Sequence, residues 1–132
     1  MIAADTNVWV RYLTNDDPTQ AQQALQLLEG ASEVFIPKTV LLEVEWVLRA
    51  VYQLQPEVVR QALLQILGLP IVRAEAASQV AMALEYQAQG MDFADALHLA
   101  ASEPAEAFYT FDAAFVKKGR ALGARVMALP TP

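Results

Sequence analysis

The first ten residues, MIAADTNVWV (1–10), set one carboxylate between two short apolar runs. The run before Asp5 predicts a buried strand over residues 2–5, and the run after it predicts a helix over residues 8–13. A strand that leads directly into a helix is typical of α/β proteins. Ligands of such folds bind outside the carboxyl ends of the strands, so Asp5 stands where a functional site is expected.

The rest of the chain repeats this alternation of strand and helix. Pro and Gly separate the segments, and an Asp17-Pro18 pair is a typical helix start. Right-handed crossovers between the strands predict a mostly parallel sheet with helices on both faces. The further predicted strands cover residues 33–36, 71–73, 107–111 and 125–129, and the further predicted helices cover residues 18–30, 39–52, 56–68, 76–89, 92–102 and 112–122.

The composition fits one folded domain. A chain of 132 residues can bury about two-thirds of its unfolded surface, so we expect residues 1–132 to form a single domain. Although 55% of the residues are hydrophobic, no uninterrupted apolar run is long enough to span a membrane. The chain has no cysteine, and its N-terminus lacks the basic start and cleavage site of a secretory signal. We therefore expect a soluble, cytoplasmic protein.

The net charge of −6 argues against a nucleic-acid partner. Lys and Arg supply much of a protein's affinity for a phosphate backbone, and this chain has only nine of them. Five of these could contact phosphate, and each could equally be an ordinary surface charge: Arg11, Lys38, Lys117, Lys118 and Arg120.

Acidic side chains fall at the ends of two predicted strands. Asp5 ends the first and Asp112 ends the fourth. Asp is also a favoured helix N-cap, because its carboxylate accepts hydrogen bonds from the free N–H groups of the first turn. Capping explains either residue taken alone. If the two strands are neighbours, however, both carboxylates lie at one edge of the sheet.

The helix predicted over residues 39–52, with Thr39 as its cap, carries two further acids. Glu45 falls on the side away from the apolar residues, four residues before Arg49, so we expect a solvated surface pair. Glu43 lies at the rim of the buried stripe and either reaches solvent or faces a polar site. At about 100° per residue, that stripe is formed by Val40, Val44, Val47 and Val51.

The stretch GMDFADALHLAAS (90–102) holds the remaining acids of interest. Asp92 is well placed as a helix N-cap. Asp95, three residues later, leaves the first turn on the same side as apolar neighbours and is the better candidate for a functional role. His98 is the only histidine, so a histidine-rich metal site is excluded, and we assign it no role.

Four acids are therefore candidates for one site: Asp5, Glu43, Asp95 and Asp112. Two carboxylates about 5 Å apart repel each other by roughly 3 kcal/mol at an effective dielectric constant of 20. A cluster of four would have to take up protons or hold a cation. Oxygen ligands without His or Cys suit Mg²⁺ or Mn²⁺, and such an ion can activate water for attack on a phosphodiester. A bound cation would also let an acidic surface accept a phosphate.

Two other classes of protein place acids at strand ends. A phosphoacceptor domain needs an Asp at the end of its third strand, but residues 18–91 contain no Asp. A phosphatase of the Asp-x-Asp kind needs a second Asp at the position that Asn7 occupies. Neither class fits the sequence.

Four segments together resemble the PIN domain, and specifically the VapC-type toxins of type II toxin–antitoxin pairs. They are DTNVWVRYL (5–13), PKTVLLEVEWVLR (37–49), DFADALHLAA (92–101) and TFDAAF (110–115), and they follow in the family's order along essentially the whole chain. The resemblance implies a three-layer ribonuclease fold whose parallel five-stranded sheet has the order 3-2-1-4-5. It also implies that Asp5, Glu43, Asp95 and Asp112 bind Mg²⁺ or Mn²⁺, with Thr6, Asn7 and Thr110 in support.

The same resemblance implies partners. VapC-like proteins cleave RNA, and a small VapB-like antitoxin neutralises them by inserting a segment near the active site. Homodimerisation is implied in the same way. Four aromatic residues could line the antitoxin groove, although core packing is an alternative for at least two of them: Trp9, Tyr12, Trp46 and Tyr52. A catalytically weak binding module that holds RNA or a protein is the alternative to a ribonuclease.

Overall fold

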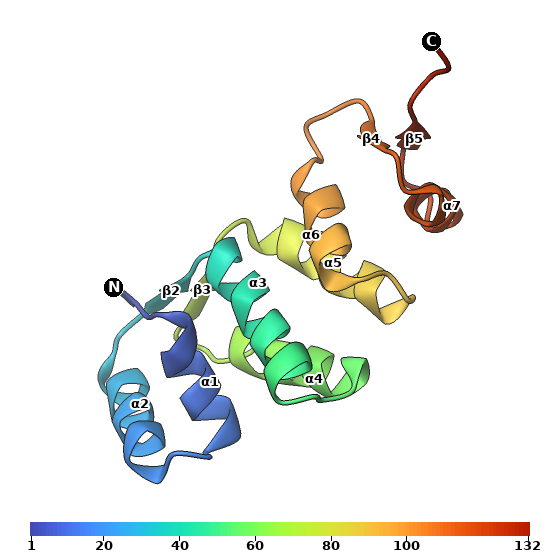
Figure 1. The fold of residues 1–132 in the computed structure, drawn as a ribbon. Coiled ribbons are helices and arrows are strands. Elements are labelled where there is room, and N and C mark those ends of the chain that lie inside the picture. Colours follow the sequence, from blue (N-terminus) through green and yellow to red (C-terminus); the bar gives the residue numbers. More distant parts are fainter. The chain divides into compact units, whose positions relative to one another are not determined.

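The computed structural model describes residues 1–132, which divide into two compact units. Unit 1 comprises Met1–Ala77, and unit 2 comprises Ser78–Pro132. Figure 1 labels most elements of the two units, which are described one at a time below. Seven α-helices and two parallel sheets confirm the predicted α/β class.

Unit 1 contains a three-stranded parallel sheet and its helices (Figure 1). The strand order is β1-β2-β3, and Val34 of β2 is the register partner of both Ile2 in β1 and Val72 in β3. The elements are β1 (Ile2–Ala3), α1 (Thr6–Thr14), α2 (Pro18–Gly30), β2 (Val34–Ile36), α3 (Lys38–Trp46), the π-helical turn η1 (Val47–Val51), α4 (Pro56–Leu67) and β3 (Val72–Ala74).

Unit 2 contains a two-stranded parallel sheet, in which Tyr109 of β4 is the register partner of Met127 in β5. Its elements are α5 (Ala77–Ala88), α6 (Phe93–Ala101), β4 (Phe108–Thr110), α7 (Ala113–Ala121) and β5 (Val126–Ala128). The first residue of α5, Ala77, is the last residue of unit 1. Within each sheet the strand order agrees with the predicted 3-2-1-4-5. The predicted pairing of β1 with β4 joins strands of different units and stays a prediction.

Four of the helices begin at an Asp, as the sequence predicts. The side chain of Asp5 accepts a hydrogen bond from the N–H of Thr6, and those of Asp17, Asp92 and Asp112 accept hydrogen bonds within the first turns of α2, α6 and α7. Each bond satisfies a donor that the helix itself cannot pair. The predicted cap of α3, Thr39, is wrong, because this helix begins at Lys38 after Pro37, and Oε1 of Glu75 accepts a hydrogen bond from the N–H of Lys38 at 2.9 Å.

The core of unit 1 includes a charged residue that we expected at the surface. Leu41, Val44 and Leu48 are the buried apolar residues of α3 and η1, whereas Val51 is exposed. The buried stripe therefore differs from the predicted one. Glu45 lies within it at 2% exposure, and its Oε2 is 2.9 Å from Nε of Arg49. The predicted pairing of Glu45 with Arg49 is confirmed, but its solvated position is wrong.

The strand β1 also differs from its prediction. Both of its residues, Ile2 and Ala3, are exposed, although a buried strand was expected. Within unit 1, β1 is the outer strand of its sheet and has β2 as its one neighbour. An outer strand presents one of its edges without a partner in the unit.

In unit 2, the sheet packs closely against α7. The rings of Phe108 and Phe115 stack with their centroids 5.3 Å apart. A Cβ atom added at Gly119 of α7 would lie 2.3 Å from a side-chain carbon of Val126 in β5. Only glycine therefore fits at this contact between helix and strand.

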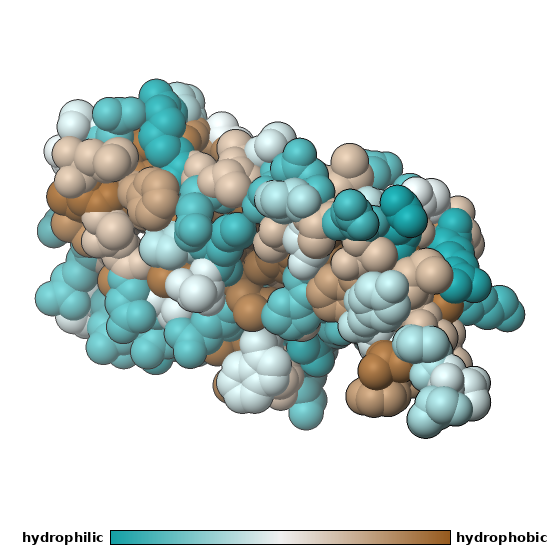
Figure 2. All heavy atoms as spheres, turned by 90° about the horizontal axis from the view of Figure 1, so that it is seen from above, coloured by the Kyte–Doolittle hydropathy of each residue, from teal (hydrophilic) through white to brown (hydrophobic).

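The surface mixes polar and apolar side chains. On the face shown in Figure 2, brown apolar groups lie among teal hydrophilic ones. None of the helices has the length and apolar character needed to cross a bilayer.

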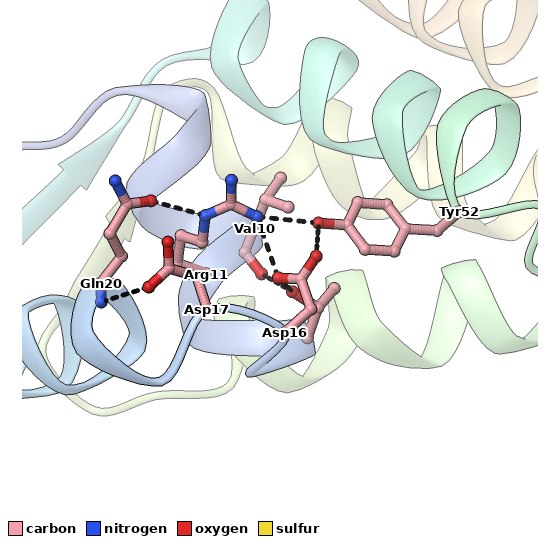
Figure 3. Close-up of polar contacts among 7 residues, drawn as sticks. Val10, Arg11, Asp16, Asp17, Gln20 and Tyr52 are labelled. Carbon is pink, nitrogen blue, oxygen red and sulfur yellow. Dashed lines mark hydrogen bonds and ion pairs between the residues drawn. The ribbon is translucent and has the colours of Figure 1, made fainter.

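A polar network in unit 1 joins the end of α1 to the residue that follows η1 (Figure 3). Nη1 of Arg11 is 2.9 Å from Oδ1 of Asp16, and the Tyr52 hydroxyl donates a 2.7 Å hydrogen bond to Oδ2 of the same carboxylate. Arg11 also donates to Oε1 of Gln20, and the Thr14 hydroxyl donates to Asp16. The network therefore holds the loop between α1 and α2 against Tyr52.

We expect the stability that Asp16 contributes to disappear in acid. The hydrogen bond from Tyr52 is the main cause that lowers the pKa of Asp16; partial burial opposes it, and Thr14 and Arg11 add to it. Because the folded state favours the charged carboxylate, its contribution is present above the unfolded pKa of about 3.9 and is lost as the pH falls through the lower folded value. Asp16→Asn should therefore lower the melting temperature at pH 7 but not at about pH 2.

Thermal unfolding of wild type and Asp16→Asn across this pH range measures the effect. Tyr52→Phe should lower the melting temperature at pH 7 by less than Asp16→Asn does, because the Asp16 carboxylate keeps its contacts with Arg11 and Thr14. This smaller difference should also disappear at about pH 2. An equal difference in melting temperature at both ends of the range would contradict this role of the charge.

Candidate functional site

Two of the predicted acids are linked in unit 1 through one threonine. Asp5 is the N-cap of α1, and its Oδ1 accepts the N–H of Thr6 at 2.8 Å. Thr6 is buried, and its hydroxyl donates a hydrogen bond to Oε1 of Glu43 on α3. Asp5 and Glu43 are themselves exposed. The residue after Asp5 therefore orients Glu43 from the neighbouring helix.

The other two acids lie in unit 2. Asp112 follows β4 and is the N-cap of α7, and its own N–H donates to Oγ1 of Thr110 at 3.0 Å. Asp95 is half-buried in the first turn of α6. Burial raises the pKa of Asp95 first of all, and the charges of Asp92 and Asp112 raise it further, while His98 acts in the opposite direction. Asp95 and Asp112 are therefore close enough to repel each other.

The capping carboxylates keep one oxygen available. Oδ1 of Asp112 accepts both cap hydrogen bonds, from Ala114 at 2.9 Å and Phe115 at 3.1 Å. Oδ1 of Asp5 likewise accepts the bond from Thr6. In both residues Oδ2 has no hydrogen-bond partner, so capping a helix and binding a ligand are compatible.

The chemistry of these side chains fits a hard divalent cation. All of the candidate ligand atoms are carboxylate oxygens, and the repulsion felt by Asp95 is the kind that a cation relieves. The structure assembles no group of three or more acidic, histidine or cysteine side chains into a metal site. It links Asp5 to Glu43 in unit 1 and brings Asp95 near Asp112 in unit 2, and the convergence of all four stays a prediction.

The predicted supporting residues differ in what they contact. Thr6 bonds Glu43, and Thr110 bonds the backbone of Asp112, so each holds a candidate ligand. Asn7 is exposed in the first turn of α1.

Lys118 lies closer to the acids of unit 2 than the sequence suggested. Its Nζ donates to the backbone oxygen of Gly90 at 2.6 Å, and its charge acts to lower the pKa of Asp95. Lys118 and Arg11 are both candidates from the sequence for phosphate contacts, with ordinary surface charge as the alternative. Arg11 instead pairs with Asp16 in the polar network of unit 1. The sequence gives little indication of this position of Lys118, because its hydrogen-bond partner Gly90 is 28 residues away in the chain.

The aromatic residues expected in a partner groove have different surroundings. Trp9 is completely buried, so its assignment to a groove is wrong and the core-packing alternative is correct. Tyr12 is half-buried, and Tyr52 bonds Asp16. Trp46 is 53% exposed, one helical turn beyond Glu43 on α3.

Comparison with known proteins identifies the family. The PIN domain family matches residues 2–121, which is most of the chain, and a search of curated proteins found no match. PIN domains are generally metal-dependent nucleases. The parallel sheets and the carboxylates at the starts of α1 and α7 agree with a nuclease-type fold. The chain therefore belongs to the PIN domain family.

Proposed function

We propose that this protein is a metal-dependent endoribonuclease that hydrolyses RNA phosphodiester bonds. The main support is the placement of its acids: Asp5 and Asp112 each cap a helix with one oxygen and leave the other unbonded. Glu43 and Asp95 lie beside them within their own units. A metal-dependent phosphodiesterase of this family would use such carboxylates to bind its cation.

The residues divide into two roles. Asp5, Asp95 and Asp112 would hold Mg²⁺ or Mn²⁺, which when bound polarises a phosphoryl oxygen and activates water. Glu43 would bind the cation or orient the attacking water. Its Oε1 is held by the Thr6 hydroxyl, so Oε2 is left to accept a hydrogen bond from that water. Attack by water rather than by the ribose 2′-hydroxyl would leave a 5′-phosphate and a 3′-hydroxyl.

Cleavage of end-labelled single-stranded RNA tests this proposal. We expect cleavage with Mg²⁺ or Mn²⁺, no cleavage in excess EDTA, and 5′-phosphate ends on the products. Asp5→Asn and Asp95→Asn should each lose activity by about 100-fold or more. Activity that persists in EDTA, or that survives both substitutions, would overturn the proposed mechanism.

Metal-dependent stability separates this enzyme from a binding module on the same fold. A cation that binds only the folded state raises the melting temperature as its concentration rises. We expect Mn²⁺ to stabilise the wild-type protein and to have little effect on Asp95→Asn. A protein that binds RNA but shows no such rise would support the binding module instead.

We also propose that the protein is the toxin of a toxin–antitoxin pair and forms a homodimer. Trp46 supports an antitoxin surface, because this exposed aromatic lies one turn from Glu43. A short neighbouring reading frame whose product binds the chain and suppresses cleavage would support this role. Light scattering of the purified chain would report its oligomeric state.

A further inference from the structure

Phe111 is the most exposed of the large apolar side chains. Its exposure is 89%, and it stands between Thr110 and Asp112 at the end of β4. A single exposed apolar residue is common and needs no explanation of its own. This one is the immediate neighbour of an acid to which the proposed function gives a metal-binding role.

The backbone on both sides of Phe111 is held in place. The N–H of Asp112 donates to Oγ1 of Thr110 at 3.0 Å, so a hydrogen bond spans Phe111. The Asp112 carboxylate in turn accepts the N–H groups of Ala114 and Phe115. A side chain that projects from an ordered backbone has less conformational entropy to lose when it binds a ligand.

A second exposed aromatic lies within β4, just before Phe111. Tyr109 is 58% exposed and precedes Phe111 by two residues. Neighbouring residues of a strand point to opposite faces, and Phe108 stacks on Phe115 of α7. Tyr109 therefore lies on the face of β4 that is turned away from α7.

We propose that Phe111 stacks on an unpaired base of the RNA substrate, next to the phosphate that is cleaved, and that Tyr109 offers a second ring. This inference rests on the proposed ribonuclease function. Single-stranded RNA is commonly bound by aromatic side chains at the surface of a sheet, where each ring stacks on one base. Lys117 is exposed on α7, the helix that Asp112 caps, and can offer positive charge to the RNA backbone.

Steady-state cleavage of a short single-stranded RNA tests the role of Phe111. Phe111→Ala should raise KM by about tenfold or more and change kcat less, because one base loses its stacking partner. Phe111→Trp should retain tight binding, whereas Phe111→Leu, which keeps an apolar side chain but no ring, should resemble Phe111→Ala. Val58→Ala, which truncates a half-exposed apolar residue on α4 of unit 1, is the matched control and should leave both constants unchanged.

Binding without chemistry gives an independent readout. In Phe111→Trp, with Trp46 changed to Phe, the remaining native tryptophan is the buried Trp9, and RNA should change the fluorescence of the introduced ring. Failure of the wild-type protein to cleave RNA with any divalent cation would overturn the proposed function, and with it this inference. Normal cleavage with an unchanged KM in Phe111→Ala would overturn only the stacking role. The stacking role would also be overturned if Phe111→Ala no longer bound a protein partner but cleaved RNA as the wild type does.

Discussion

Replacing Asp112 by Asn is expected to reduce metal-dependent RNA cleavage by about 100-fold or more while changing the free energy of unfolding by less than about 0.5 kcal/mol. The side chain of Asn has the same shape and is an equally good helix cap, so it can still accept the hydrogen bonds from Ala114 and Phe115. It lacks the negative charge that a cation needs. The substitution thus separates the two roles that Asp112 combines.

Three further variants complete this experiment. Asp5→Asn should behave like Asp112→Asn, because Asp5 also caps a helix with one oxygen. Asp17→Asn is the matched control, since Asp17 caps α2 and has no proposed part in the site, so its cleavage rate should match the wild type. Asp112→Ala should lose activity and also about 1 kcal/mol of stability, because the cap is gone. Full activity in Asp112→Asn would show that this carboxylate only caps α7.

Replacing Arg49 by Met is expected to destabilise unit 1 by about 2 kcal/mol. Glu45 is 2% exposed, and Arg49 is its charged partner at 2.9 Å. Without Arg49, the buried carboxylate of Glu45 has lost its counter-ion. The expected cost is below that of breaking a fully buried pair, because the Arg49 side chain is 41% exposed and solvent already screens its charge.

A double substitution tests whether the charge or the packing is responsible. Glu45→Leu combined with Arg49→Met replaces the pair by apolar side chains and should recover most of the lost stability. Urea unfolding of the two single variants and the double variant gives the coupling energy. If Arg49→Met alone costs nothing, the carboxylate of Glu45 does not depend on Arg49.

The starts of the helices were predictable because their signals are local. Asp17 followed by Pro18 needs nothing beyond the neighbouring residues to begin α2, and the same holds for Asp92 and Asp112. The positions of Glu45 and Trp9 were not predictable in this way. The helix that holds Glu45 is apolar on most of its sides, so periodicity alone does not determine which stripe enters the core.

The candidate site was predictable in its residues but not in its contacts. Strand ends and helix caps single out Asp5 and Asp112 from sequence alone. The bond between Thr6 and Glu43 spans 37 residues and depends on how α1 packs against α3, which no local pattern encodes. Phe111 was missed because an aromatic residue at the end of a predicted strand is usually read as part of the core, whereas here its side chain is exposed.

The π-helical turn η1 sets the angular phase of the residues that follow it. The N–H of Tyr52 bonds the carbonyl of Val47, five residues earlier, so this turn holds one residue more than an α-helical turn. Removing one residue there would rotate Tyr52 by about 100° around the helix axis, away from Asp16. Deleting one residue within residues 47–51 would therefore change the direction in which the Tyr52 side chain points. The loop between α1 and α2 would then lose the Tyr52 hydroxyl as a hydrogen-bond donor, although no residue of that loop had been altered.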